Sequence, residues 1–241
     1  MCSVCWKWQD SVEASTAQLL IIFNRDEQKT RAIANPPESI RVGASTALMP
    51  IDPDKGGSWI ATNEYGLTIA LLNNYEVLPD KATKYESRGI VVKNLSKCCT
   101  LPELEESLRA MLLEKAYPAF SLLIWETKSR LVQMYKWDEN SLVLSSPQAS
   151  FFTSSSWNSE AVQNYRTDSY VNAVINNEVP IRTFMSSVAR GREKWSVYME
   201  REQTQTVSVS TIKVYGTETH FTYYDRVSDK KSLNKLEFTT G

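Results

Sequence analysis

The first 27 residues combine two strand patterns with a cysteine and a run of charged residues. Every second residue from Cys2 to Trp8 is apolar, which is the period of a β-strand and places Cys2 on the apolar face of that strand. Residues 19–23 form a short apolar run that predicts a second, buried strand, and the polar residues 24–27 follow it directly. We therefore expect the thiol of Cys2 to lie beside Arg25, in two adjacent strands of one sheet.

Removal of Met1 would give Cys2 a free α-amine in addition to its thiol. An amine with a pKa of about 8 can accept a proton from a thiol with a pKa of about 8.5 near neutral pH, so this one residue can supply a nucleophile and its base. This matters because the chain contains a single histidine, His220, in a predicted strand where a structural role is more common. The alternative is that Cys2 is simply a small apolar residue packed in a first strand.

Four short motifs in the first third of the chain carry a resemblance to a known family. They are Met1-Cys2, residues 23–27 with the tetrapeptide Asn24-Arg25-Asp26-Glu27, residues 56–59 and residues 72–75. With these motifs the chain resembles the NRDE family, also called the transport and Golgi organisation protein 2 family, over essentially its whole length. That family in turn is similar to the choloylglycine hydrolase and acyltransferase branch of the N-terminal-nucleophile hydrolases.

The resemblance implies both a fold and an activity. The expected fold is α+β, with two stacked antiparallel sheets and outer helices in four αββα layers, formed by residues 1–241 as one N-terminal-nucleophile-hydrolase-like domain. The order of the predicted elements, in which groups of strands alternate with pairs of helices, also favours a layered α+β fold over repeated βαβ units. The implied activity is that of a hydrolase or acyltransferase with a processed N-terminal cysteine.

The same resemblance assigns roles to individual residues. Cys2 is the expected nucleophile, and Arg25 is expected to stabilise its thiolate and lower its pKa. Asp26 is expected to hold the α-amine, and Asn73 to donate an N–H group to the oxyanion. The remaining residues, expected to bind the substrate, are Asn24, Glu27, Trp59, Asn74 and Arg201.

Simpler interpretations of these residues stand beside the catalytic ones. Asn73-Asn74 is typical of a turn, because asparagine tolerates left-handed backbone geometry. A charged pair such as Arg25-Asp26 is also common where a strand ends at the surface. The hydrolase pattern has an aspartate three residues after its arginine, where this chain has Gln28.

Composition and charge argue against several other classes of protein. The formal net charge is −1 and no long basic or acidic block occurs, so nothing indicates a nucleic-acid partner. No apolar run approaches the roughly 20 residues of a membrane span, and no stretch has the pattern of a signal peptide. Cys2 and Cys5, three apart on a strand, point to opposite faces and cannot clamp one metal ion. We expect a cytoplasmic protein with a small-molecule substrate or ligand, no cofactor and no disulfide framework.

Other segments carry weaker patterns. Residues 31–54, interrupted by four prolines, predict a long ordered loop that walls the site. Residues 58–62 and 67–73 predict a hairpin around a turn at 63–66. Helices are expected at 90–95, 100–116, 158–176 and 181–188, the second with Thr100 as its N-cap. Further strands are expected at 120–125, 131–137, 142–144, 150–153, 195–200, 206–214, 220–224 and 236–239.

Two functions from different classes therefore remain open. The first is a Cys2-dependent amidohydrolase or acyltransferase that acts on a small amide or thioester. The second is a non-catalytic protein on the same fold that binds or carries a small molecule. For the second function, the family resemblance implies haem or an acyl lipid as the ligand.

Overall fold

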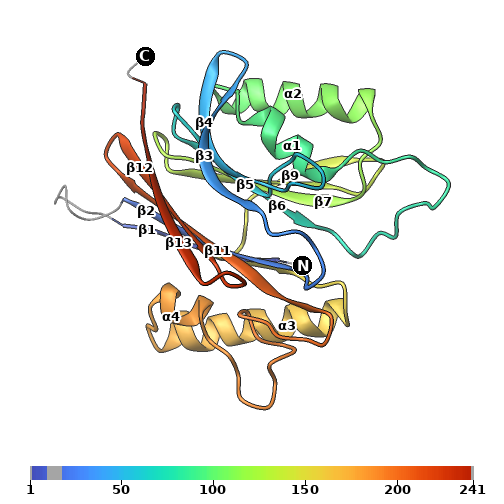
Figure 1. The fold of residues 1–241 in the computed structure, drawn as a ribbon, viewed down its shortest axis with the longest axis vertical. Helices are drawn as coiled ribbons and strands as arrows, with labels where there is room; N and C mark the ends of the chain where they lie inside the picture. Colours follow the sequence, from blue (N-terminus) through green and yellow to red (C-terminus); the bar gives the residue numbers. More distant parts are fainter. Residues whose placement is uncertain (1, 10–17, 240–241) are drawn as a thin grey trace.

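Two antiparallel sheets lie face to face in the computed structural model, which describes residues 2–9 and 18–239 (Figure 1). The first sheet has six strands in the order β10-β1-β2-β11-β12-β13. Their bounds are β1 Cys2–Trp8, β2 Leu19–Gln28, β10 Phe151–Ser154, β11 Thr204–Tyr215, β12 Glu218–Asp225 and β13 Lys230–Glu237. The polar turn that the sequence places at residues 10–16 lies outside the described residues.

The second sheet has seven strands, which follow the chain order from β3 to β9. Their bounds are β3 Asn35–Val42, β4 Ser45–Ile51, β5 Ile60–Asn63, β6 Leu67–Asn73, β7 Phe120–Glu126, β8 Leu131–Trp137 and β9 Leu142–Ser145. The predicted hairpin is confirmed as β5 and β6. Its turn is closed by a hydrogen bond from the Gly66 N–H to the Asn63 carbonyl at 3.1 Å, and Gly66 adopts the positive φ of 79° that favours glycine.

Helices cover the outer face of each sheet, so the order of layers is αββα (Figure 1). Helices α1 Arg88–Leu95 and α2 Leu101–Glu114 pack on the seven-stranded sheet. Helices α3 Ser159–Tyr170 and α4 Ile181–Met185, with the π-helical turn Val171–Asn176 between them, pack on the six-stranded sheet. The α2 N-terminus forms where the sequence predicts it, because the Thr100 hydroxyl accepts from the Glu103 N–H at 3.4 Å.

Both sheets are apolar on both faces, and this requires four layers. In β6, Ala70 and Leu72 pack between the sheets, whereas Ile69 and Leu71 pack under α1 and α2. Between the sheets, the rings of Trp6 and Trp125 meet edge to face with centroids 5.3 Å apart. Residues on alternate sides of one strand thus contribute to two different cores.

The structure corrects the expectation of a long loop at residues 31–54. Most of this segment forms the hairpin of β3 and β4 at one edge of the seven-stranded sheet. Pro36 and Pro37 fit there because an edge strand has one side that needs no ladder hydrogen bonds, and the β3–β4 register shifts between Asn35 and Glu38. Proline is thus a weaker loop signal at a sheet edge than the sequence pattern suggests.

Several other segments differ from the sequence predictions; the last strand, for example, is β13 Lys230–Glu237 rather than residues 236–239. The second strand does not end before the polar tetrapeptide but continues to Gln28, because β11 pairs with it as far as Thr204↔Gln28. Residues 195–200 do not form a strand; there, only an isolated bridge between Glu200 and Gln205 occurs. Among the described residues, no helix is long and apolar enough to cross a membrane.

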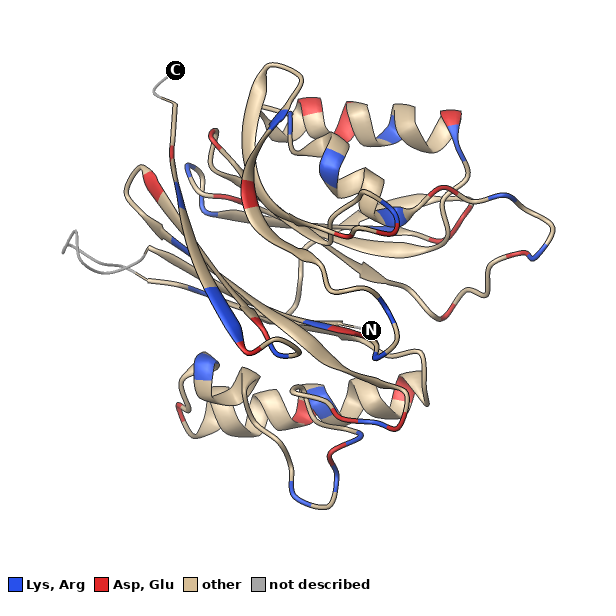
Figure 2. Ribbon diagram, viewed as in Figure 1, with Lys and Arg blue, Asp and Glu red and all other residues tan. Residues whose placement is uncertain are grey.

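Acidic and basic residues are interspersed along the elements rather than gathered by sign (Figure 2). Helix α2 carries both signs, with Arg109 2.8 Å from Glu105 one turn away. Helix α1 differs, because its charged residues are Arg88 and Lys93 and both are basic. This distribution becomes relevant at the cavity that α1 helps to line.

Candidate active site

Cys2 lies in the middle of a three-strand register at the edge of the inter-sheet core. In the sheet it is paired with Arg25 of β2 on one side and with Ser154 of β10 on the other. Paired residues in antiparallel strands point to the same face, so Cys2 and Arg25 both face the second sheet. The Cys2 residue is 8% exposed. The prediction that Cys2 and Arg25 lie side by side on adjacent strands is confirmed.

A cavity of about 360 Å³ opens at this point between the two sheets. Its walls come from the N-terminal end of β1, the C-terminal half of β2, the loop between β4 and β5, the end of β6, and the segment that leads into α1. The residues on which we draw below are Cys2, Arg25, Asp26, Glu27, Arg31, Asp52, Lys55, Gly57, Trp59, Asn73, Glu86, Arg88 and Gly89.

Arg25 is held in the cavity wall by an aromatic ring and two carboxylates. Its guanidinium carbon lies 4.2 Å from the centroid of the Trp59 ring, a cation–π geometry. One guanidinium nitrogen donates to Asp52 at 2.9 Å and is 3.4 Å from Glu27. Arg31 also contacts Asp52, at 2.8 Å. The charge of Arg25 is therefore largely compensated by protein groups and only partly available to a thiolate.

Asp52 was not predicted from the sequence, although it organises this wall. Its second oxygen accepts from the backbone N–H groups of Asp54 at 3.0 Å and Lys55 at 3.2 Å. An aspartate between Pro50 and Pro53 is a recognisable turn signal, so the loop itself could have been predicted. Its ion pairs with Arg25 and Arg31 could not, because they join segments whose contact depends on the fold.

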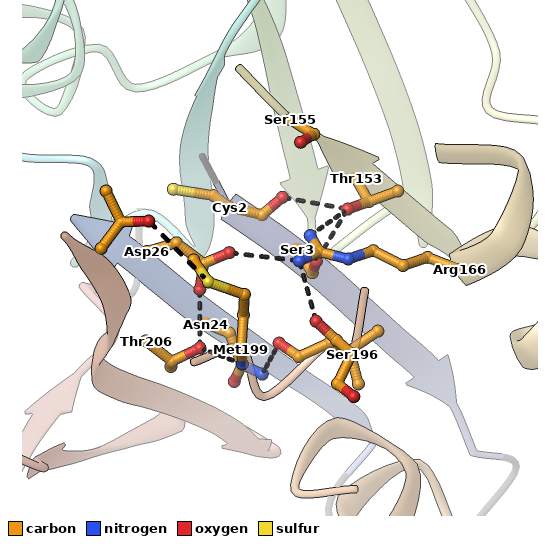
Figure 3. Close-up of polar contacts among 12 residues, drawn as sticks. Cys2, Ser3, Asn24, Asp26, Thr153, Ser155, Arg166, Ser196, Met199 and Thr206 are labelled. Carbon is orange, nitrogen blue, oxygen red and sulfur yellow. Dashed lines mark hydrogen bonds and ion pairs between the residues drawn. The ribbon is translucent and has the colours of Figure 1, made fainter. Parts of the chain in front are cut away.

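Asp26 follows Arg25 in β2, so its side chain points to the opposite face of the strand. There it lies in a buried polar network with Thr206 and Arg166 (Figure 3). One oxygen accepts from the Thr206 hydroxyl at 2.6 Å, and the other lies 3.5 Å from a guanidinium nitrogen of Arg166. Both the Asp26 and the Arg166 side chains are fully buried. Arg166, on α3, also donates to the hydroxyls of Ser3 at 3.1 Å and Thr153 at 3.0 Å.

Arg166 completes its hydrogen bonds with two backbone carbonyls. It donates to the carbonyl of Trp195 at 3.0 Å and to that of Ser196 at 2.8 Å. The sequence analysis missed this residue. A signal was present, because Val162, Arg166 and Tyr170 recur every four residues and form the buried stripe of α3. An arginine within an apolar helical stripe indicates a buried ionic partner.

Burial dominates the ionisation of the two groups nearest the end of β1. It raises the pKa of the Cys2 thiol to about 11, and the nearby Asp26 carboxylate acts in the same direction. Burial also raises the pKa of Asp26, although Arg166 and the Thr206 hydroxyl oppose that shift. The expectation that Arg25 lowers the thiol pKa is corrected: its effect is in that direction but smaller than the effect of burial.

Six of the nine predicted site residues line the cavity, namely Cys2, Arg25, Asp26, Glu27, Trp59 and Asn73. The amide nitrogen of Asn73 donates to the Tyr75 hydroxyl at 3.0 Å. Asn74 lies instead in an adjoining cavity of about 40 Å³ that Asn73 shares. The roles assigned to the residues that line the main cavity stay predictions.

Asn24 and Arg201 do not line the main cavity. Asn24 is fully buried on the helix side of β2, where its amide nitrogen donates to the carbonyls of Met185 at 2.7 Å and Val197 at 2.9 Å. These hydrogen bonds connect β2 to the end of α4 and to the segment that follows it. The expected contact of Asn24 with the substrate does not fit this position. Arg201 stacks on Trp157, with its guanidinium carbon 4.8 Å from the ring centroid. Burial lowers the pKa of Arg201 to about 10, and nearby Arg166 adds to the shift.

Comparison with solved structures shows which fold this architecture represents. A cysteine-to-alanine mutant of the conjugated bile acid hydrolase from Clostridium perfringens matches with a TM-score of 0.53 and 10% identity, over 99% of this chain and 97% of the hydrolase. An arginine-to-leucine variant of the same hydrolase matches with a TM-score of 0.55 and 10% identity, over 100% and 97% of the two chains. At this identity the likeness shows the fold, which is that of an N-terminal-nucleophile hydrolase.

Comparison at the level of sequence shows the family. No curated protein matches the chain significantly. The family model for Transport and Golgi organisation 2 matches residues 1–230, which is nearly the whole chain. The chain therefore belongs to the Transport and Golgi organisation 2 family, with an N-terminal-nucleophile-hydrolase-like fold.

Proposed function

We propose that this chain is a cysteine amidohydrolase or acyltransferase that acts on a small amide or thioester, with Cys2 as the nucleophile after removal of Met1. The observation that carries the proposal is the position of Cys2. It lines the cavity between the two sheets at the N-terminal end of β1, beside Arg25 on the adjacent strand. A nucleophile needs access to a cavity, a base and a donor for the oxyanion. The first of these is present in the structure, and the other two follow from the chemistry below.

The base is the α-amine that removal of Met1 would expose on Cys2. In its neutral form this amine takes the thiol proton, and the sulfur attacks the acyl carbon of the substrate. The carbonyl oxygen becomes an oxyanion, and the C–N or C–S bond to the leaving group then breaks. The ammonium returns its proton to the leaving group, which leaves an acyl thioester on Cys2. Water, or an acceptor amine or thiol in the transferase case, repeats these steps and regenerates the free thiol.

Asn73 supports the proposal as the oxyanion donor. An amide nitrogen carries two N–H groups, and its one described hydrogen bond is to the Tyr75 hydroxyl. A neutral donor at the end of a strand suits this role, because it is fixed in place before the charge develops. Asp26, buried and ion-paired with Arg166, supports the role of an anchor for the α-ammonium group.

A second candidate function, a small-molecule binding or carrier protein, is favoured by a specific observation. The thiol of Cys2 is buried with a pKa of about 11, and Arg25 is already paired with Asp52 and Glu27. A thiol in this state is a poor nucleophile at neutral pH. The two functions therefore differ in whether exposure of the α-amine activates the sulfur.

Labelling with iodoacetamide as a function of pH separates the two functions. Intact mass first establishes whether Met1 is absent, and peptide mass spectrometry then gives the labelling rate at each cysteine. Cys99 is exposed and serves as an internal reference for a solvent-accessible cysteine. We expect Cys2 of the processed protein to react faster than Cys99 below pH 8, and Asn73→Ala to leave this labelling unchanged while it abolishes turnover of an acyl substrate.

The matched control is the same chain with a short N-terminal extension, which converts the α-amine of Cys2 into an amide that cannot act as a base. In this control, Cys2 is expected to label more slowly than Cys99 across the neutral range, because burial raises the pKa of its thiol to about 11. If Cys2 of the processed protein labels as slowly as the blocked control, the catalytic proposal is wrong and the carrier function is favoured.

A further inference from the structure

We propose that Arg88 forms an anion-binding subsite in the cavity that contains Cys2, and that the substrate carries a carboxylate or phosphate group there. The proposal rests on the proposed function, since it names the substrate class of the same cavity. Arg88 is the first residue of α1, and its side chain lines the cavity together with Cys2 and Arg25. Lys55, exposed at the same cavity, adds a second positive charge.

The carboxylates of the cavity wall are balanced by their cationic partners without any contribution from Arg88 or Lys55. Within the described part of the chain, each carboxylate of the wall already has a cationic partner: Glu27 and Asp52 contact Arg25 and Arg31, Glu86 contacts Lys115, and Asp26 contacts Arg166. No described carboxylate lies within ion-pair distance of Arg88 or Lys55. The wall therefore carries two positive charges that have no described carboxylate at ion-pair distance.

The side chain of Arg88 is oriented by backbone groups that use only its Nε–H. This group is shared between the carbonyls of Pro118 at 3.2 Å and Ala119 at 3.0 Å. The two terminal nitrogens make no hydrogen bond to any described residue. The guanidinium is thus held through Nε, and its terminal N–H groups are available to a ligand. Two such N–H groups can bind two oxygens of a carboxylate or phosphate in a bidentate manner.

Burial makes this arrangement costly for the protein alone. Desolvation lowers the pKa of Arg88, and Tyr75, Glu139 and Tyr85 oppose this shift only in part. Glu139 is directed to other partners, since it accepts from the Tyr85 hydroxyl at 2.5 Å and from the Ala119 N–H at 3.4 Å. A half-buried cation without an anion is unfavourable, and an anionic group of a ligand would compensate it.

Two glycines hold Arg88 beside the cavity. A Cβ on Gly57 would lie 2.4 Å from the carbonyl carbon of Gly89, and a Cβ on Gly89 would lie 3.0 Å from the backbone nitrogen of Ser58. The Ser58 N–H donates to the Gly89 carbonyl at 3.0 Å across this contact. The loop that precedes β5 and the first turn of α1 are thus in direct backbone contact, and this fixes the position from which Arg88 reaches the cavity.

The test measures binding of three probes to Cys2→Ala protein, in which no turnover can occur. Hexanoylglycine carries a carboxylate, hexyl phosphate carries a phosphate, and hexanamide is neutral. By isothermal titration calorimetry we expect at least one anionic probe to bind more tightly than hexanamide, and Arg88→Gln to weaken that probe about 10- to 100-fold, as for the loss of charge-assisted hydrogen bonds. The tighter of the two anionic probes identifies the group that the subsite prefers.

Matched variants separate a binding role of Arg88 from a structural one. Arg109→Gln, on the exposed face of α2 away from the cavity, should change no affinity. Arg88→Lys keeps the positive charge and should lose less affinity for the anionic probe than Arg88→Gln; this variant also carries the test if Arg88→Gln does not fold. Equal weakening of all three probes by Arg88→Gln, or anionic probes that bind no more tightly than hexanamide, would overturn the subsite.

The outcome is independent of the acyl chemistry. Anion binding that depends on Arg88, in a protein whose Cys2 never reacts with iodoacetamide, would support the subsite and overturn the proposed catalysis. A reactive Cys2 in a protein that does not bind either anionic probe at millimolar concentration would support the proposed catalysis and overturn the subsite.

Discussion

Replacement of Arg166 by methionine tests the buried network beneath Cys2 most directly. Methionine has a similar length and keeps the apolar stem, but it removes the ion pair with Asp26 and the donors to Ser3 and Thr153. Both charged side chains of the pair are fully buried, so water cannot replace the lost partner without a local change of structure.

The magnitude follows from the cost of a buried charge without a partner. Removal of one member of a buried ion pair typically costs about 3–5 kcal/mol, because the other charge stays desolvated. We therefore expect Arg166→Met to lower the free energy of unfolding by about 4 kcal/mol at pH 7. Addition of Asp26→Asn to this variant removes the orphaned charge and should restore about 2 kcal/mol, a coupling in the range that contacting residues show.

The loss of stability should depend on pH in a defined direction. Burial raises the pKa of Asp26 above its ordinary value of 3.8 in the folded protein, so its contribution to stability is present below that value and decreases as pH rises through the folded pKa. Arg166 opposes this rise in pKa. Without Arg166 the folded pKa rises further, and the destabilisation should be largest at neutral pH and shrink as pH falls toward about 4.

Urea denaturation followed by tryptophan fluorescence, from pH 4 to pH 8, measures these differences. Arg166→Lys is the matched control, because it retains the positive charge but not the several N–H donors of the guanidinium. Its free energy of unfolding should lie between those of the wild type and Arg166→Met. A loss below about 1 kcal/mol, the value of an exposed pair, with no dependence on pH, would refute the view that Arg166 compensates a buried Asp26 carboxylate.

Two further substitutions test the surroundings of the cavity. Asn24→Ala should lower the free energy of unfolding by about 2–4 kcal/mol, since it leaves the carbonyls of Met185 and Val197 buried without their donor; a neutral result in denaturation would contradict the structural role of Asn24. Gly57→Ala should lower the free energy of unfolding by about 1–3 kcal/mol through collision with Gly89. It should also weaken the binding of the anionic probe. Gly216→Ala, in open space at a φ of 55°, measures backbone strain alone, and an equal cost in the two glycine variants would argue against the collision.

Local patterns in the sequence were sufficient to predict the strands and hairpins that depend on near neighbours. The alternation from Cys2 onward predicted a strand with Cys2 on its apolar face, because side chains in a strand alternate between two faces. The turn from Asn63 to Gly66 and the Thr100 cap likewise depend on residues within a few positions of one another. The family motifs added the order of the layers.

The same patterns were misleading where a segment's role depends on its place in a sheet. The prolines of residues 31–54 are breakers in the centre of a sheet but are tolerated in β3, an edge strand. The polar residues 24–27 look like the end of a strand, yet β11 pairs with them and continues the strand to Gln28. Whether a strand lies at an edge or in the centre is set by partners from distant parts of the chain.

The sequence by itself thus predicted Cys2 as the candidate nucleophile, the strand that bears it and the neighbouring arginine. Only the tertiary structure decided the ionisation of that group, because burial and the arrangement of charges set the pKa of Cys2 and Asp26. Arg166 reaches Ser3 across 163 residues of sequence, and Asn24, which shares the motif with Arg25, turns away from the cavity into the helix layer. The type of a side chain is given by the residue itself, whereas its burial and its interaction partners depend on how the whole chain packs.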